Sequence, residues 1–384
     1  MDGLLRGLAE KHEVSLLTLR SSDEHTQSSL AATREYCRHV FDFELDVLNP
    51  DNKRKRALQL RSLVSRRTFE ALHMYHADFQ SYFDRTVAQG SYDVVQVEFA
   101  QMGVYGLPRG VGKRPRYVLD EHNVEYEISK RTAEGSGSKL RKLYNSVNWR
   151  KLRHEERRAW ANFDGVSLTS VRDEQLLRAE APSVRTRVVP NGVDVETFRS
   201  TGKPAVADEL LFFGALSYYP NTDGLDHFID ETLPRIVAKR PSVRLRVVGP
   251  SPASSTLARV SRHVEVVGFV DELLPEIERA SVVIVPLRIG GGTRLKIIEA
   301  MAVGRPIVST RLGAEGIDVT HEKQLLLADT PDAFANEVVR ALEDSALAAR
   351  LGASARQLAE ERYSWRAAVR NLEDFYKDLG TLAS

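Results

Sequence analysis

The stretch of residues 281–310, SVVIVPLRIGGGTRLKIIEAMAVGRPIVST, constrains the fold more than any other part of the chain. Residues 281–286 are a short apolar run rich in β-branched side chains, which predicts a strand buried on both faces. A glycine loop follows, and Thr293 is expected to open a helix. Residues 306–310 predict the next buried strand. The order strand, loop, helix, strand is the repeating unit of a parallel α/β sheet.

The expected helix carries its own signals for packing and for termination. Leu295, Ile298 and Met301 fall at helical spacing, so they are predicted to form its packed face. Gly304 and Pro306 are typical of a helix end, because glycine tolerates the left-handed C′ conformation and proline cannot continue the helix.

The same stretch predicts an anion site. A glycine loop before a helix N-terminus presents free backbone N–H groups, and the helix dipole adds positive potential. The loop consists of Gly290, Gly291 and Gly292. Arg294 and Lys296 are expected in the first turn, where the dipole disfavours cations unless an anion binds there. Glu299, one turn further on, is spaced to accept hydrogen bonds from ribose hydroxyls. The alternative is a solvated first turn in which Lys296 and Glu299 pair at i, i+3.

Composition bounds the remaining possibilities. A chain of 384 residues is too long for one hydrophobic core and favours two domains. Lys and Arg number 54 against 53 Asp and Glu, so nothing in the overall charge indicates nucleic-acid binding. The single cysteine, Cys37, excludes an intrachain disulfide and indicates a reducing compartment. The sequence has no apolar run of membrane-spanning length and no signal peptide, so we expect a cytoplasmic protein.

Strand-like and helix-like segments alternate along both halves of the chain, which predicts parallel sheets covered by helices. The expected strands of the first half are residues 12–19, 40–47, 92–98, 116–121, 165–170 and 187–190, with a long helix at 139–163. Those of the second half are residues 209–214, 243–249, 264–268, 281–286, 306–310 and 324–327. We predict two doubly wound, Rossmann-like α/β domains facing across a cleft. The expected domains are 1–195 joined by the C-terminal helix at 364–384, and 196–363.

Five segments resemble the retaining glycosyltransferases of the group-one type, family 4. They are VVPNGVD at 188–194, LRVVGPSP at 245–252, VEVVGFV at 264–270, the glycine-loop stretch at 290–310 and DEHNVE at 120–125. They occur in the family's order, and the resemblance runs from residue 1 to about residue 378. The form GALSYYPNTDGLDHF at 214–228 is similar to the sugar transferases of bacterial exopolysaccharide clusters.

The resemblance implies the GT-B fold and a reaction. A sugar would pass from a nucleotide-diphosphate donor to a saccharide or polyprenyl-linked acceptor, with retention of anomeric configuration. The nucleotide-sugar is a substrate, so no cofactor is implied; a UDP-sugar is favoured and a GDP-sugar is the alternative. In the second domain, Glu299 would hold the ribose and the glycine loop with Thr293 would meet the diphosphate. The remaining donor-binding residues implied are Gly268, Phe269 and Val270 at the base, and Leu295. The last helix, carrying Trp365, would cross back to the first domain.

Two departures from the family concern the donor site. Many members carry a second glutamate eight positions before the ribose-binding one, and that position is Gly291 here. A carboxylate nucleophile there is therefore excluded, and positioning and stabilisation of the leaving diphosphate are expected to carry the reaction. The family also often supplies an arginine and a lysine just after the first strand of the second domain. This chain has Ala215, Leu216 and Asn221 there. We hypothesise that Arg294 and Lys296 replace those cations.

A third departure lies at the start of the chain. The family's first domain opens with a strand and a glycine-rich turn, whereas this sequence begins in an expected helix at residues 3–10. The first strand of a doubly wound sheet is central, so its loss would expose backbone groups of both neighbours. A start codon assigned too late explains this more simply than a tolerated deletion. A protein that truly begins here is expected to have a damaged acceptor side and low activity.

His122 is the catalytic candidate of the first half, together with Arg294 and Lys296 of the second. It follows the strand at 116–121, and the resemblance implies that it faces the donor sugar and the acceptor. Without the resemblance, a histidine that caps the next helix is favoured, with Asn123 as the better N-cap. Glu98 ends a strand and is a weaker candidate, whose alternative is an arginine partner. Glu315 follows the last strand of the stretch and is better interpreted as a turn residue.

Two basic stretches suggest peripheral contact with an anionic membrane, which a polyprenyl-linked acceptor would make useful. They are residues 52–67 and the helix carrying Lys139, Arg141, Lys142, Arg150, Lys151, Arg153, Arg157 and Arg158. A solvated helix face partly neutralised by Glu155 and Glu156 is the favoured alternative. No cluster of metal-ligand residues is evident in the sequence, so metal-independent transfer is predicted.

Two other functions fit the same architecture. A nucleotide-sugar epimerase would turn over donor with no acceptor present, whereas a transferase would hydrolyse it only slowly. A non-catalytic nucleotide-sugar-binding partner in polysaccharide assembly would bind donor and release no nucleotide with any acceptor. Gly291 and Glu299 do not separate these functions.

Overall fold

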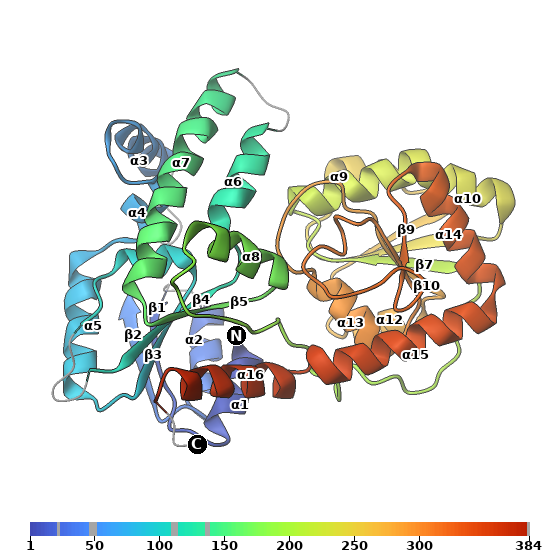
Figure 1. Ribbon diagram of the computed structural model, residues 1–384. Coiled ribbons are helices and arrows are strands. Elements are labelled where there is room, and N and C mark those ends of the chain that lie inside the picture. The colour runs from blue at the N-terminus through green and yellow to red at the C-terminus, as the bar shows by residue number, and fades with distance from the viewer. Residues whose placement is uncertain (21–23, 46–51, 109–113, 135–138, 382–384) are drawn as a thin grey trace. The chain divides into compact units, whose positions relative to one another are not determined.

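The computed structural model describes residues 1–20, 24–45, 52–108, 114–134 and 139–381 (Figure 1). The chain divides into two compact units, each described separately. Unit 1 is Met1–Pro190 with Ala368–Ser384, and unit 2 is Asn191–Ala367. The chain therefore leaves unit 1 once and returns to it inside its last helix, α16 Trp365–Asp378.

Unit 1 contains two parallel sheets. A two-stranded sheet pairs β1 Ser15–Arg20 with β2 His39–Glu44. A four-stranded sheet has the order β3-β4-β5-β6. Its strands are β3 Val94–Glu98, β4 Arg116–Glu121, β5 Gly165–Leu168 and β6 Thr186–Val188. Among the described residues, no hydrogen-bonded ladder joins β1 to β3.

The described residues of unit 1 also form helices, and those that contact the four-stranded sheet lie on both of its faces. The helices are α1 Asp2–Ala9, α2 Glu24–Thr33, α3 Asn52–Val64, α4 Phe69–Met74, α5 Ala77–Gln89, α6 Glu125–Glu134, α7 Lys139–Asn162 and α8 Val171–Glu180, with a 3-10 helix at Ala100–Val104. Successive side chains of a strand point to opposite faces. Tyr117 and Leu119 of β4 join the core formed with Trp160 of α7. The opposite face receives α16, whose Phe375 ring would meet a Cβ at position 165 at 2.5 Å. Gly165 is therefore needed for this close approach.

Unit 2 contains one six-stranded parallel sheet with the order β12-β11-β10-β7-β8-β9. Its strands are β7 Glu209–Phe213, β8 Arg244–Val248, β9 Val264–Gly268, β10 Val282–Val285, β11 Ile307–Ser309 and β12 Leu326–Leu327. The strand order reverses beside β7, and ligands of open α/β sheets bind at the carboxyl ends of strands near such a switch point. The glycine loop follows β10, the strand paired with β7.

Helices cover both faces of this sheet. They are α9 Tyr219–His227, a π-helix at Phe228–Thr232, α10 Leu233–Lys239, α11 Ser254–Leu257, α12 Leu274–Arg279, α13 Leu295–Val303, α14 Pro331–Glu343 and α15 Ser345–Arg362. Leu210 and Phe212 of β7 pack with α9, α10 and α14, whereas Leu211 and Phe213 pack with α12, α13 and α15 (Figure 1). The alternation of one strand between two buried faces explains why β7 is apolar from Leu210 to Phe213.

The sequence predicted the order of these elements, but not all of their bounds. The expected strand at 12–19 begins only at Ser15, and the one at 324–327 is reduced to Leu326–Leu327. Residues 46 and 47 of the expected strand at 40–47 lie outside the described residues. Within the described residues, no helix combines the length and the apolar character that crossing a bilayer requires. Cys37 is buried with a free thiol.

Candidate functional site

The glycine loop of unit 2 connects β10 to α13, but the helix begins later than predicted. Helix α13 starts at Leu295 with Arg294 as N-cap, so Thr293 belongs to the loop. Gly290 has φ +106° and Gly292 has φ +80°, in the left-handed region that favours glycine. Gly304 ends the helix with φ +78°, as predicted. The loop therefore leads into the N-terminus of α13, where the N-cap residue Arg294 makes no side-chain capping hydrogen bond.

The predicted packed face of α13 was wrong at its first position. Leu295 is 49% exposed, while Ile297, Ile298 and Met301 are fully buried. Because α13 begins at Leu295, this side chain lies at the exposed end of the helix. Its assignment to the donor site remains a prediction.

The ammonium of Lys296 points into the interior of unit 2, where its partners are uncharged side chains. Its Nζ donates to Oδ1 of Asn221 at 2.9 Å and lies 4.3 Å from the centroid of the Phe212 ring. A Cβ at position 214 would come within 2.9 Å of Nζ, so the ammonium occupies the space that Gly214 leaves open. Burial lowers the pKa of Lys296 to about 7, and the charge of Arg294 adds to this effect while Glu299 opposes it.

The expected alternative for this turn does not hold. No ion pair joins Lys296 to Glu299 in the described part of the chain, and both residues are half-buried. Burial raises the pKa of Glu299, against the opposing charge of Lys296. Two half-buried ionisable groups with shifted pKa values in one helical turn make this turn a candidate site.

Arg294 and Thr293 complete the polar lining of the loop. The Arg294 guanidinium is largely buried, at 8% exposure, and donates through Nη1 to the carbonyl oxygen of Gly291. The hydroxyl oxygen of Thr293 is buried and has no hydrogen-bond partner among the described residues. A buried hydroxyl without a partner costs free energy, which a bound anion would recover. Arg294 therefore stabilises the loop through this hydrogen bond. The Thr293 hydroxyl could donate a hydrogen bond to a bound anion.

The predicted base-binding segment follows β9. Gly268 has φ +86°, and its carbonyl oxygen accepts from the N–H of Gly249 at 2.7 Å. The Phe269 side chain is 70% exposed, whereas Val270 packs against the core on the α13 side of the sheet. Glu315 lies in a turn whose N–H donates to the carbonyl of Leu312 at 3.3 Å.

In unit 1, His122 belongs to a cluster of polar side chains at the carboxyl ends of β3 and β4. Its Nε2 lies 3.0 Å from Glu98 Oε2 and 3.5 Å from Asp120 Oδ2. Glu98 and Asp120 are direct partners in the β3–β4 register. The bond to Glu98 and the charges of Asp120 and Glu98 raise the pKa of His122, although burial opposes them. Burial and the charge of Glu98 raise the pKa of Asp120 to about 7.

This geometry corrects two interpretations of the sequence. Glu98 has a histidine partner, not an arginine. His122 does not cap α6, since Glu156 accepts from the N–H groups of Glu125 and Tyr126 at 2.8 and 3.1 Å. Asn123 instead donates to the Glu125 side chain at 3.4 Å.

The ligand atoms of Glu98, Asp120 and His122 all lie within 4.8 Å of one another. The structure thus assembles a three-residue group that could hold a metal ion, which the sequence spacing had not revealed. The prediction of metal-independent transfer remains a prediction.

Sequence reasoning missed the residues that support these side chains. The His122 cluster also contains Asp120, and it is extended by Gln96 and Tyr376 through hydrogen bonds to Glu98 and Gln96. The Phe212 ring contacts the ammonium of Lys296. A signal existed for the first two, because Gln96 and Glu98 share one face of a strand, as Asp120 and His122 do. Nothing in the local pattern around Tyr376 or Phe212 connects them to residues far away in the sequence.

The basic helix α7 is less solvated than expected. Arg153 binds Glu180 at 2.6 Å, and Lys151 donates to the carbonyls of Ser62 and Ser65 at 2.6 and 2.8 Å. Glu155 accepts from Thr68, and Glu156 is almost fully buried, so neither neutralises a solvated face. The side chains of Lys139, Arg141 and Lys142 lie outside the described residues.

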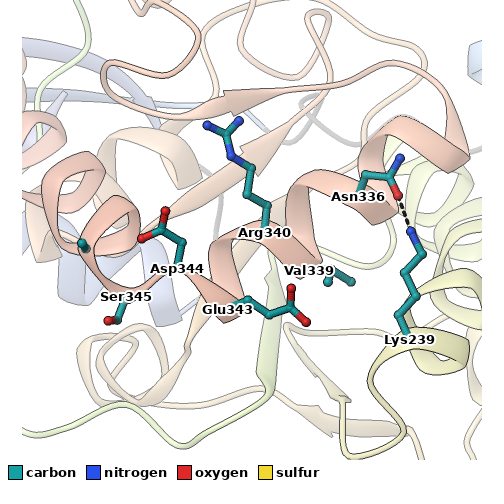
Figure 2. A pocket seen from close by; sticks show the side chains of 8 residues that line it. Lys239, Asn336, Val339, Arg340, Glu343, Asp344 and Ser345 are labelled. Atoms are coloured by element: carbon teal, nitrogen blue, oxygen red, sulfur yellow. Dashed lines mark hydrogen bonds between the residues drawn. The ribbon is translucent and has the colours of Figure 1, made fainter.

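A surface pocket of about 460 Å³ in unit 2 lies elsewhere (Figure 2). It is lined by Lys239, Asn336, Val339, Arg340, Glu343, Asp344, Ser345 and Ala346, from α10, α14 and α15. None of the predicted donor-binding residues lines it, and Asp344 and Glu343 would repel a diphosphate. It is therefore not the candidate site.

Comparison with known proteins is consistent with this description. The family described as Glycosyltransferase Family 4 matches residues 1–197, and that described as Glycosyl transferases group 1 matches residues 207–344. A phosphatidyl-myo-inositol mannosyltransferase of Mycobacterium tuberculosis is 30% identical over 208 residues, which are 49% of this chain and 53% of that protein. A GDP-mannose-dependent alpha-(1-6)-phosphatidylinositol monomannoside mannosyltransferase of the same organism is 28% identical over 261 residues, 61% of this chain and 67% of that protein. The chain spans about half the length of the first of these relatives.

Two solved structures share the fold over nearly the whole chain. Sucrose-phosphate synthase from Thermosynechococcus elongatus has a TM-score of 0.70 at 20% identity, covering 99% of this chain and 92% of that one. HepE of Anabaena in complex with UDP and glucose has a TM-score of 0.66 at 15% identity, covering 99% and 95%. The predicted α/β fold with parallel sheets in two domains is thereby confirmed. Since one family description matches more than half of its residues, the chain belongs to glycosyltransferase family 4.

Proposed function

We propose that the protein transfers a sugar from a nucleotide-diphosphate donor to a saccharide or lipid-linked acceptor, with retention of anomeric configuration. The observation that carries this proposal is the ammonium of Lys296, whose partners among the described residues are an amide oxygen and an aromatic ring. A desolvated cation at a helix N-terminus without a carboxylate partner is costly, and a diphosphate would offset that cost.

The neighbouring side chains suit the same ligand. The backbone N–H groups of the glycine loop and the partnerless Thr293 hydroxyl would donate to phosphate oxygens. Arg294 and Lys296 would supply the positive charge, and Glu299, one turn along α13, would accept from the ribose hydroxyls. Gly268, Phe269 and Val270 would line the base.

Catalysis would then depend on stabilising the leaving group. Gly291 stands where a carboxylate nucleophile would be needed, so no covalent intermediate on that position is proposed. Lys296 and Arg294 would stabilise the negative charge that develops on the leaving diphosphate. His122 would hydrogen-bond the transferred sugar or assist departure of the diphosphate.

The identities of the base and of the acceptor are inferred from the names of the relatives, from the nucleotide bound to HepE and from the base-binding segment. The name of one relative specifies GDP-mannose, and the names of both relatives specify phosphatidylinositol-based acceptors. The HepE structure was solved with UDP. A pocket lined largely by backbone suits uracil, so UDP and GDP both need to be tested, with a lipid-linked acceptor preferred.

The test is a calorimetric titration of the protein with UDP and then GDP in EDTA. We expect saturable binding of one nucleotide, weakened about tenfold to a hundredfold in Lys296→Met, because a charge-assisted contact to phosphate is lost. Lys239→Met is the matched control, since Lys239 also bonds an asparagine side chain, Asn336, but at the other pocket (Figure 2). Equal affinity of the wild type and Lys296→Met would contradict the site.

Turnover assays separate the rival functions. Donor conversion without acceptor would indicate an epimerase, and nucleotide binding without release of nucleotide on addition of any acceptor would indicate a non-catalytic partner. Acceptor-dependent release of nucleotide supports the transferase.

Helix α3 provides the surface for the proposed membrane contact. Leu60, Leu63 and Val64 are 67%, 48% and 90% exposed, and at i, i+3 and i+4 they share one face of the helix. Basic residues surround them, without a single acidic residue between positions 52 and 67. They are Lys53, Arg54, Lys55, Arg56, Arg61, Arg66 and Arg67. Exposed apolar side chains beside dense positive charge fit the interface of an anionic bilayer.

A further inference from the structure

His122 is the end of a chain of hydrogen bonds that begins in helix α16. The hydroxyl of Tyr376 donates to Gln96 Oε1 at 2.6 Å, and Gln96 Nε2 donates to Glu98 Oε1 at 2.7 Å. The second carboxylate oxygen of Glu98 lies 3.0 Å from His122 Nε2. These contacts connect α16, β3 and the residue after β4, all within unit 1.

The direction of every bond in this chain is fixed by chemistry. A carboxylate accepts only, so Glu98 accepts from the Gln96 amide on one side and from the imidazole on the other. His122 must then carry a proton on Nε2. In the neutral imidazole this leaves Nδ1 as the free acceptor, and in the imidazolium it leaves Nδ1–H as the free donor.

The register of the sheet explains how the cluster forms. Glu98 of β3 pairs with Asp120 of β4, which pairs with Ser167 of β5. The Ser167 hydroxyl donates to Asp120 Oδ1 at 2.6 Å, which leaves Oδ2 facing the imidazole at 3.5 Å. Glu98 is closer to Nε2 than Asp120 is, so Glu98 is the principal acceptor.

The imidazole ring is also held from one face. Phe99 stacks on it with ring centroids 4.2 Å apart and an interplanar angle of 26°. Phe99 has φ +71°, in the left-handed region that non-glycine residues avoid because of steric strain. A strained residue that packs on a candidate catalytic ring is the kind of outlier that marks a functional site.

The chain of bonds leads from a buried group to two accessible ones. Tyr376 is 7% exposed, whereas the side chains of Glu98 and His122 are 23% and 21% exposed. A purely structural polar network would have no need of an accessible end. The chain instead leads from the interior to one imidazole whose Nδ1 has no described protein partner.

We propose that Glu98 is a positioning residue that fixes His122 as the Nε2–H tautomer, which leaves Nδ1 as the ring nitrogen available to a substrate, and that Gln96 and Tyr376 hold Glu98 in place. This inference rests on the proposed function for the role of His122, but not for its geometry. The charged and titratable groups that act on the ring are Glu98, Asp120, the Met1 amino group and Glu125.

The first test reads His122 without any substrate. Histidine is labelled with ¹⁵N and ¹³C, and the His122 resonance is assigned by its loss in His122→Gln. We expect the neutral form of the wild type to carry its proton on Nε2. In Glu98→Gln we expect part of the neutral form to carry its proton on Nδ1, since the amide that replaces the carboxylate can also donate to Nε2. A proton on Nδ1 in the wild type, or an unchanged tautomer in Glu98→Gln, would overturn the proposal.

The second test measures transfer by the same variants. Glu98→Gln should lower kcat about tenfold or more and move the pH profile, with the KM for donor unchanged. Tyr376→Phe should give a smaller loss of kcat in the same direction. Tyr117→Phe is the control, because it removes another buried tyrosine hydroxyl of unit 1, which donates to the carbonyl oxygen of Pro108. A similar loss in Tyr117→Phe would mean that only general packing was affected.

The two tests distinguish the failure of each proposal. Absence of nucleotide binding or transfer in the wild type would count against the proposed function, while the tautomer of His122 still decides whether Glu98 positions it. Normal transfer with unchanged kinetics in Glu98→Gln would overturn the positioning role alone.

Discussion

The ammonium of Lys296 lies 2.9 Å from the side-chain oxygen of Asn221, a residue 75 positions earlier in the chain. Asn221 belongs to α9, and its side-chain Nδ2 donates to the carbonyl oxygen of Ala215 at 2.8 Å. The amide is thereby oriented with its oxygen toward the lysine. A neutral partner holds the cation in place without neutralising it, so its charge remains for a ligand.

Nucleotide binding should take up a proton above pH 7.5. The pKa of Lys296 is lowered to about 7, so the free protein is largely neutral at this position in alkaline solution. A bound diphosphate favours the charged form and raises that pKa, and the lysine then takes a proton from the buffer. The affinity should accordingly fall as the pH rises above 7. Calorimetry at pH 8 in buffers of different ionisation enthalpy measures the uptake, which should approach one proton and disappear in Lys296→Met.

Asn221→Asp should weaken nucleotide binding by about tenfold or more. A carboxylate 2.9 Å from the ammonium would form an ion pair that competes with the diphosphate, and it would add negative charge beside the site. Asn336→Asp beside Lys239 is the matched control and should leave the affinity unchanged. Undiminished binding by Asn221→Asp would mean that the diphosphate is held away from Lys296.

The stability of unit 1 should decrease as the pH rises from 5 to 8, and Glu121→Gln should reduce this dependence. Glu121 is fully buried, and its Oε2 accepts from the indole N–H of Trp160. Burial and the charge of Glu156 raise the pKa of Glu121 well above its usual value, and burial raises that of Glu156 to about 8. Acids whose pKa is higher in the folded state stabilise it at low pH, and this contribution is lost as the pH rises through the folded pKa.

Thermal unfolding followed between pH 5 and pH 8 measures this effect. The midpoint of Glu121→Gln should fall less steeply than that of the wild type, because glutamine keeps an acceptor for Trp160 and cannot ionise. Glu180→Gln is the control, since Glu180 binds the surface residues Arg153 and Arg157. Parallel slopes for the wild type and Glu121→Gln would contradict the expectation.

Leu60→Ser combined with Val64→Ser should reduce binding to vesicles of phosphatidylglycerol by about tenfold or more. Each apolar side chain contributes about 1.5 kcal/mol or more when buried in the interface, and these two are among the exposed apolar residues of α3. Co-sedimentation with anionic and with zwitterionic vesicles measures the partition. Val171→Ser, at another exposed apolar position of unit 1, should bind as the wild type does. Equal binding to both vesicle types would exclude the electrostatic component.

The order of strands and helices and the location of the glycine loop follow from local sequence patterns. Strands such as β10 are apolar at every position because both of their faces are buried, and this pattern is local. The left-handed Gly304 at the end of α13 was predictable for the same reason. The start of α13 was not predictable in this way, because threonine is common at the start of a helix, whereas the structure places Thr293 in the loop and begins the helix at Leu295.

The side chains that surround each candidate residue could be identified only in the folded chain. Lys296 meets Phe212 and Asn221, and His122 meets Glu98 through the register of β3 with β4. The chain of bonds then reaches Tyr376, 254 residues after His122. Parallel strands and returning helices bring together residues that are far apart in sequence, and no local periodicity encodes such pairings. The desolvation that shifts the pKa of Lys296, Asp120 and Glu121 arises from those same contacts, so the electrostatics of both sites became evident only in the folded chain.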